Sequence, residues 1–209
     1  GTPAQRTIWE TVKHHFAVSA CILQKDARIG KIIGFYSVVF AAHTLLFFYS
    51  QQYFADFGYN KVQISVIMLL VGGASCFGAL ASEKMYRRFG KRCLIPETVI
   101  IAGAILCYGA GKAGVAIAAL MCAGFANAAL YPIQSDSLNA LIPSEQRATL
   151  ISVDSMCFSI AMIVLFPLAG AFADRWGLKT VLLLLGAILL LFLLAAFCIE
   201  KESFSSDHS

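Results

Sequence analysis

Charged residues are scarce in this sequence. Only 13% of its 209 residues are Asp, Glu, Lys or Arg, whereas 59% are hydrophobic, and the mean hydropathy is +0.75. A soluble domain usually carries about 25% charged residues. Because the deficit extends over the whole length, the composition excludes an ordinary soluble domain and predicts a membrane protein.

The sequence also lacks the motifs of metal sites and of membrane enzymes. Its seven cysteines form no CxxC pair and no Cys/His cluster, so we expect small core or lipid-facing residues, and neither a metal nor a cofactor. There is no GxSG or HExxH motif, and His43 is the one histidine inside an apolar run. An intramembrane enzyme is therefore the least favoured function.

Six apolar runs are long enough to cross a membrane. A helix needs about 20 apolar residues to span the hydrocarbon layer of roughly 30 Å. The runs are too long and too continuous for the strands of a membrane barrel. They cover residues 32–55, 62–82, 93–111, 113–139, 148–173 and 180–199. We therefore expect an all-α integral membrane protein, a bundle of six transmembrane helices over residues 32–199.

Short loops between the runs make successive helices antiparallel, and the basic residues then set the orientation. If residues 1–31 are cytoplasmic, twelve of the sixteen Lys and Arg residues fall on that side and four on the other. This bias predicts a multi-pass protein of the cell membrane with both termini in the cytoplasm. It also accounts for the net charge of +4, which is therefore no evidence for a nucleic-acid partner.

The two ends of the sequence differ from the apolar runs. Residues 1–31 have apolar side chains at helical spacing among basic and polar ones, which predicts a cytoplasmic amphipathic linker helix. Residues 200–209 are polar and are predicted to be a disordered cytoplasmic tail.

Two glycine-centred charged loops lie at opposite ends of the predicted bundle. In the stretch GAFADRWGLK the residues of interest are Gly170, Asp174, Arg175, Gly177 and Lys179. In the stretch GALASEKMYRRFGKR they are Gly78, Glu83, Arg88, Gly90 and Arg92. A glycine lets the chain reverse sharply, and the charges can cap helix ends or form ion pairs that differ between conformations. Such loops suit gates at the aqueous rims of a transporter.

The first loop resembles the GxxxDRxGxK/R signature of the major facilitator superfamily, position by position. The second loop resembles the same signature more loosely, with Glu83 near the position of its Asp. The stretch LNALIPSEQRATLIS, which contains Arg147, is similar to the loop between the tenth and eleventh helices of drug-exporter-like members. The stretch FPLAG, with Pro167 and Gly170, resembles the bend of the eleventh helix.

This resemblance covers essentially the whole chain and implies the C-terminal half of a twelve-helix transporter. The family implies two three-helix units, residues 32–111 and 113–199, related by inverted topology, and an N-terminal six-helix half as partner. It implies a secondary transporter that moves a small-molecule substrate by alternating access, with efflux and proton coupling expected. A transport-dead interaction or sensor subunit with the same fold is the alternative.

Polar residues inside the spans are costly in lipid and are therefore the candidates for a substrate and proton pathway. His43 lies near the middle of the first span, and its imidazole suits a coupled proton or a polar substrate. Asn127, Tyr131 and Gln134 share one face of the fourth span by their spacing. In the resembling family the first and fourth helices of each half line the cavity, so we expect these four side chains to face one another. Hydrogen bonds that only hold helices together are the alternative.

Two carboxylates lie close to Arg147 at the predicted cytoplasmic boundary. Asp136 ends one span and Asp154 begins the next. Opposite charges at such a boundary favour a structural or gating ion-pair network over a proton site.

Overall fold

The computed structural model describes residues 27–90, 94–141 and 147–206. These residues form six α-helices and a short 3-10 turn, with no strand among them. The elements are α2 (Ala27–Asp56), α3 (Lys61–Phe89), α4 (Leu94–Cys107), η2 (Tyr108–Ala110), α5 (Ala113–Asn139), α6 (Arg147–Trp176) and α7 (Leu178–Ser206). The prediction of an all-α, six-helix bundle is confirmed.

Most of the helices match the thickness of a membrane. Among the described residues α2, α3, α5, α6 and α7 are long and apolar enough to span it, whereas α4 and η2 together form a shorter apolar helix. Lipid offers no hydrogen-bond partners to a peptide group, so a chain this apolar satisfies its backbone within helices. The protein is a multi-pass membrane protein.

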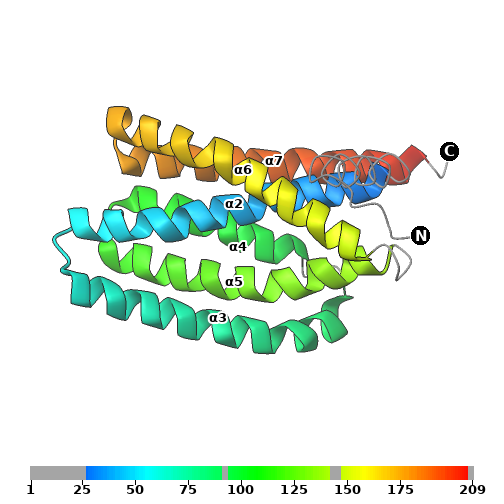
Figure 1. Ribbon diagram of the computed structural model, residues 1–209, viewed down its shortest axis with the longest axis horizontal. Helices are drawn as coiled ribbons and strands as arrows, with labels where there is room; N and C mark the ends of the chain where they lie inside the picture. Colours follow the sequence, from blue (N-terminus) through cyan, green and yellow to red (C-terminus); the bar gives the residue numbers. More distant parts are fainter. Residues whose placement is uncertain (1–26, 91–93, 142–146, 207–209) are drawn as a thin grey trace, which may run out of the picture.

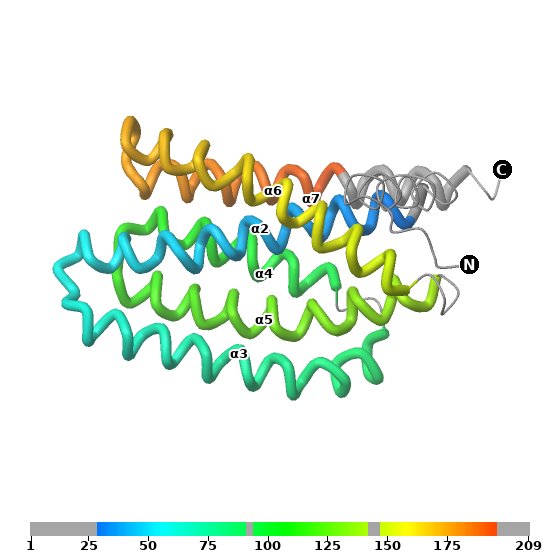
Figure 2. Tube along the Cα trace, viewed as in Figure 1, coloured from blue at the N-terminus to red at the C-terminus, as the bar shows by residue number. Residues whose placement is uncertain are grey.

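Successive helices run antiparallel along the long axis of the bundle (Figure 1). The beginning of α2 and the end of α7 lie together at one end, which we call the terminal end. The chain reverses between α2 and α3, between α4 and α5, and between α6 and α7 at the opposite end, which we call the distal end. The trace in Figure 2 follows these three reversals.

The helices pair in an exchanged pattern. Helix α5 packs mainly against α3 and α4, α2 packs mainly against α6, and α4 also packs against α7. If α2–α4 and α5–α7 are taken as two units, the first helix of each unit lies against the second helix of the other. This exchange is the arrangement expected of two inverted three-helix units.

The approach of α3 to α5 is especially close, because small residues line it. A Cβ atom on Gly78 would lie 2.9 Å from the carbonyl carbon of Phe125 and would press on its carbonyl oxygen. A Cβ atom on Gly124 would lie 2.8 Å from Oγ of Ser75 and 3.1 Å from a methyl group of Val71. Small residues let the backbones approach, and this is how membrane helices pack tightly.

A single residue separates α6 from α7. Gly177 has φ of +80°, and its N–H donates to the carbonyl oxygen of Ala173 at 2.9 Å. Glycine tolerates this left-handed conformation because it has no Cβ atom. The reversal between α2 and α3 is closed differently, by a capping box in which Asn60 and Gln63 each bond the other's backbone N–H.

Burial is uneven across the bundle. The main core joins α2, α4 and α5 and contains large, fully buried side chains such as Leu46, Phe54 and Tyr108. Helix α6 contributes only Leu150 and Val153 to the buried residues, and both lie near its beginning.

Several helices extend beyond the predicted spans. Helix α2 starts at Ala27, inside the expected linker, and α3 continues past residue 82 to Phe89. Helix α7 continues through Ser206, so the predicted disordered tail is wrong for residues 200–206. An apolar run marks only the part of a helix that lies in lipid, whereas Glu, Lys and Arg continue a helix readily into the aqueous layer. Residues 1–26 and 207–209 lie outside the described part of the chain.

Candidate functional site

Helices α2 and α5 carry the predicted pathway residues, and they pack against each other along a contact that we call the α2–α5 seam. The rings of Phe40 on α2 and Tyr131 on α5 lie 5.6 Å apart, centroid to centroid, and this contact fixes the register of the two helices. Because the helices are antiparallel, His43 and Asn127 both lie on the distal side of the contact (Figure 1). Gln134 lies on its terminal side.

Both helices of the seam carry buried polar atoms without partners. Within the described residues, Nε2 of His43, Oδ1 of Asn127 and Oε1 of Gln134 are buried and have no hydrogen-bond partner. Oγ of Ser37 on α2 is in the same state and lies on the terminal side of the ring contact, as Gln134 does. A buried polar group without a partner costs about 1–3 kcal/mol, so four of them in an apolar bundle are unusual.

Gln134 also joins α5 to α6. Its side chain is fully buried, and Nε2 donates to Oδ1 of Asp154 at 3.5 Å. This hydrogen bond is long, and it leaves the amide oxygen of Gln134 unpaired. Helices α2 and α5 thus carry an imidazole, two amides and a hydroxyl with unpartnered buried atoms, and one of the amides bonds a carboxylate on α6. These groups can bind a small polar solute or pass a proton.

Tyr131 departs from the predicted arrangement. Its spacing from Asn127 and Gln134 predicts one shared face, but its side chain is 55% exposed, whereas Gln134 is 0% exposed. The contact with Phe40 lies at the margin of the seam, and the tyrosine is therefore at its rim.

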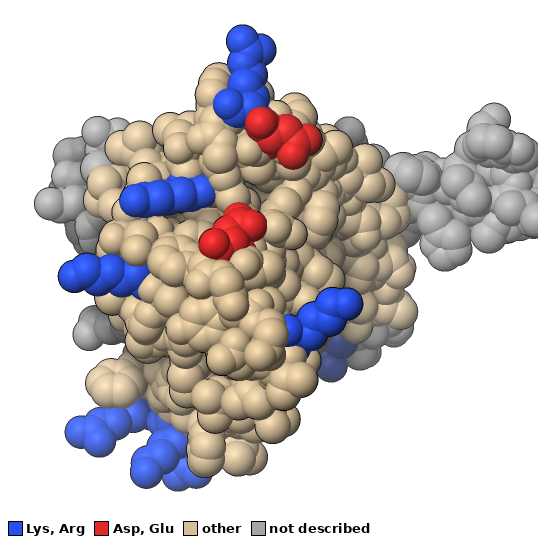
Figure 3. Space-filling view, turned by 90° about the vertical axis from the view of Figure 1, so that its left-hand side faces the viewer, with Lys and Arg blue, Asp and Glu red and all other residues tan. Residues whose placement is uncertain are grey.

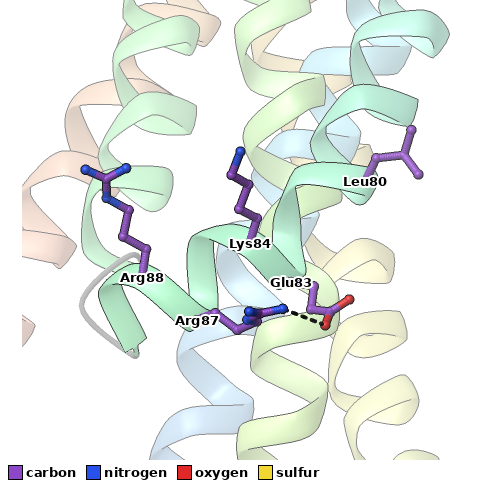
Figure 4. Close-up of a pocket in the computed structure, with 5 residues that line it drawn as sticks. All are labelled: Leu80, Glu83, Lys84, Arg87 and Arg88. Atoms are coloured by element: carbon purple, nitrogen blue, oxygen red, sulfur yellow. Dashed lines mark ion pairs between the residues drawn. The ribbon is translucent and has the colours of Figure 1, made fainter.

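Among the described residues of the terminal end, the predicted ion pairs of Arg147 with Asp136 and Asp154 and of Glu83 with Arg88 are not formed. Arg147 is exposed and makes no ion pair with Asp154 or Asp136, because Asp154 lies two helical turns away and bonds Gln134 instead. Glu83 pairs with Arg87, at 4.0 Å between Oε1 and a guanidinium nitrogen, and not with Arg88 (Figure 4).

Two residues of the second charged loop have structural roles. Gly90 follows α3 with φ of +59°, and its N–H donates to the carbonyl oxygen of Tyr86. The guanidinium of Arg88 lies 5.6 Å from the ring centroid of Phe89. Gly78 belongs to the close α3–α5 contact described above. Arg92 lies outside the described residues.

The first charged loop lies at the distal end. Asp174, Arg175 and Lys179 are exposed there, and no ion pair joins them in the described structure. Figure 3 looks onto this end and shows separated basic and acidic side chains on a mostly uncharged surface.

The bend region of α6 touches α2 near the same end. Tyr49 stacks on Phe166, and its hydroxyl donates to the carbonyl oxygen of Phe166 at 3.2 Å. A Cβ atom on Gly170 would lie 3.1 Å from that hydroxyl, so the glycine makes room for the tyrosine. Pro167 lies within α6 between these contacts and removes one backbone donor from the helix.

Sequence reasoning missed several buried polar residues, among them Ser37 and Glu97. Ser37 has a short side chain in a long apolar run, and nothing in its sequence context marks it. Glu97 is 1% exposed in the first turn of α4, and neither carboxylate oxygen has a partner among the described residues. Its charge in an apolar run was a visible signal, but the sequence does not show which way it points.

Metal ligands do not gather in the described part of the chain. No three His, Cys, Asp or Glu side chains there lie close enough together to hold an ion.

Residues 37–208 match the family model described as Major Facilitator Superfamily. No curated protein and no solved structure matches the chain.

Proposed function

Because the chain belongs to the Major Facilitator Superfamily, a family of membrane transporters, we propose that it is the C-terminal half of a secondary active transporter. In this proposal it moves a small molecule by alternating access and is coupled to protons. The observation that carries the proposal is that His43 on α2 and Asn127 and Gln134 on α5 hold unpartnered buried atoms in an otherwise apolar bundle.

The position of the seam supports a role in transport. Helices α2 and α5 are the first helices of the two three-helix units, and in the family these helices line the central cavity. Polar groups inside a membrane bundle are costly and are retained where they serve a pathway. His43 is the one described side chain of the seam that titrates near neutral pH in water, so we assign the proton to it.

We propose that a partner supplies the wall of the cavity that faces α2 and α5. An N-terminal six-helix half would place a second wall opposite α2 and α5, and the bilayer would surround both halves. The excess of Lys and Arg at the terminal end supports a cell-membrane location with both termini in the cytoplasm. The likeness of residues 138–152 to the corresponding loop of drug-exporter-like members supports efflux.

Transport can be tested in everted membrane vesicles that contain both halves. Uptake of ethidium and of a panel of labelled small metabolites would be followed with an imposed pH gradient and after addition of a protonophore. We expect His43→Ala, Asn127→Ala and Gln134→Ala to reduce proton-dependent uptake. Gln52→Ala is the matched control, because Gln52 is exposed near the distal end of α2 and bonds only Asp56 in the described structure.

Four results would each contradict part of this proposal. Unchanged uptake in all three variants would show that His43, Asn127 and Gln134 do not belong to the transport pathway. If the complete assembly took up none of the compounds, the transport-dead sensor subunit would be favoured. Proton-coupled uptake by vesicles that contain this chain alone would contradict the half-transporter assignment. A phosphatase fused after Lys112 should be active outside the cell, and activity inside would reverse the topology.

A further inference from the structure

One face of α3 changes from apolar to basic at the terminal end. Phe77, Leu80, Lys84 and Arg88 follow one another at intervals of three, four and four residues, so they share one face of the helix. The first two side chains are 70% and 79% exposed, and the two basic side chains are exposed as well. We call these four residues the α3 stripe.

The change of character occurs at the depth of the lipid headgroups. The 21 residues from 62 to 82 carry no charge, and at 1.5 Å per residue they extend over about 31 Å. The hydrocarbon layer is about 30 Å thick. With that segment in hydrocarbon, Phe77 and Leu80 lie beside acyl chains, and Lys84 and Arg88 lie at the level of the phosphates.

The two cations of the stripe differ from Arg87 in having no acidic partner in the described structure, although the guanidinium of Arg88 also lies over the ring of Phe89. Arg87 turns to Glu83, whereas Lys84 and Arg88 extend side by side away from that pair (Figure 4). In the described part of the chain neither Lys84 nor Arg88 has an ion-pair partner. An open hollow of about 510 Å³ lies against this region of α3, lined by Leu80, Glu83, Lys84, Arg87 and Arg88.

We propose that the α3 stripe binds one anionic phospholipid. The phosphate lies between Lys84 and Arg88, and an acyl chain follows Phe77 and Leu80. A bridging phosphate oxygen accepts from both cations at a depth where water is partly excluded, which strengthens charge-assisted hydrogen bonds. The apolar half of the stripe selects a lipid over a free phosphate ion. This inference is independent of transport.

The test uses the purified full chain in detergent, titrated with phosphatidylglycerol or phosphatidylcholine and followed by native mass spectrometry. We expect tighter binding of phosphatidylglycerol. Lys84→Gln and Arg88→Gln should each weaken it about fivefold, and the double variant about 25-fold, since a basic residue near the surface contributes about that factor. Lys84→Arg with Arg88→Lys should retain binding, which also shows that substitution here leaves the fold intact.

The matched control removes the neighbouring ion pair without changing the net charge. Glu83→Gln with Arg87→Gln should bind phosphatidylglycerol as the wild type does. Equal loss in this control would overturn the assignment to Lys84 and Arg88. Equal binding of the two lipids would overturn the anionic preference. If free glycerol phosphate competed at the same concentration as the lipid, Phe77 and Leu80 would not contribute to binding, and the proposed acyl-chain contact would be wrong.

Discussion

The α3–α5 contact gives a quantitative prediction for Gly78→Ala. The added Cβ atom would lie 2.9 Å from the carbonyl carbon and 3.0 Å from the Cα atom of Phe125. Carbon atoms in contact prefer about 3.5–4.0 Å, so the two helices must separate by at least about 0.6 Å. The obstructing atoms belong to backbone, which cannot rotate away as a side chain can.

The cost of this separation can be estimated from known effects. Overpacking costs about 1–3 kcal/mol, and alanine returns up to about 1 kcal/mol through its helix propensity. We expect a net loss of about 1–2 kcal/mol, which lowers the Tm by about 2–8 °C for a chain of this length. Thermal unfolding of the purified chain, followed by circular dichroism, measures the shift.

Gly73 provides the matched control on the same helix. A Cβ atom there would have nothing within 4 Å, so Gly73→Ala gains helix propensity without a clash. Its Tm should rise by about 2–4 °C, as expected for about 1 kcal/mol of added stability. If Gly78→Ala were as stable as Gly73→Ala, the close approach of α3 and α5 would be wrong.

Three further substitutions test contacts elsewhere, each by its shift in the free energy of unfolding in a denaturing-detergent titration. Tyr108→Phe removes a buried hydroxyl 2.6 Å from Oγ of Ser50 and should cost about 1–2 kcal/mol; additive losses when combined with Ser50→Ala would contradict the bond. Asn60→Ala breaks the capping box with Gln63 and should cost about 1 kcal/mol, whereas no loss would mean that the cap is unused. Gly177→Ala forces a Cβ atom into the left-handed region and should cost about 1–2 kcal/mol, and a neutral effect would contradict the observed turn.

The sequence predicts the helices of this protein well because length and polarity decide them. Six uncharged or nearly uncharged runs leave the chain no other way to satisfy its backbone in lipid. Sequence spacing also places Asn127 and Gln134 on one face of α5, and both carry a buried polar atom without a partner among the described residues.

The direction of individual side chains could not be predicted in the same way. In a soluble helix an apolar stripe marks the core, but a membrane helix is apolar on all sides and has no such stripe. Tyr131 at the rim and Glu97 in the interior illustrate the two resulting errors. The predicted ion pair of Asp154 was wrong for a related reason. Its carboxylate accepts a hydrogen bond from the amide of Gln134 on another helix, and no local sequence pattern reveals such a partner.

The burial of α6 has a mechanical consequence. Its buried residues, Leu150 and Val153, lie close to the terminal end, and the remainder of the helix extends for about 35 Å without another buried residue. The position of this long segment therefore depends on partly exposed contacts with α2 and α7 and on the one-residue turn at Gly177. Near the distal end, the ring and the hydroxyl of Tyr49 on α2 hold this segment in place by stacking on Phe166 and by bonding its carbonyl oxygen.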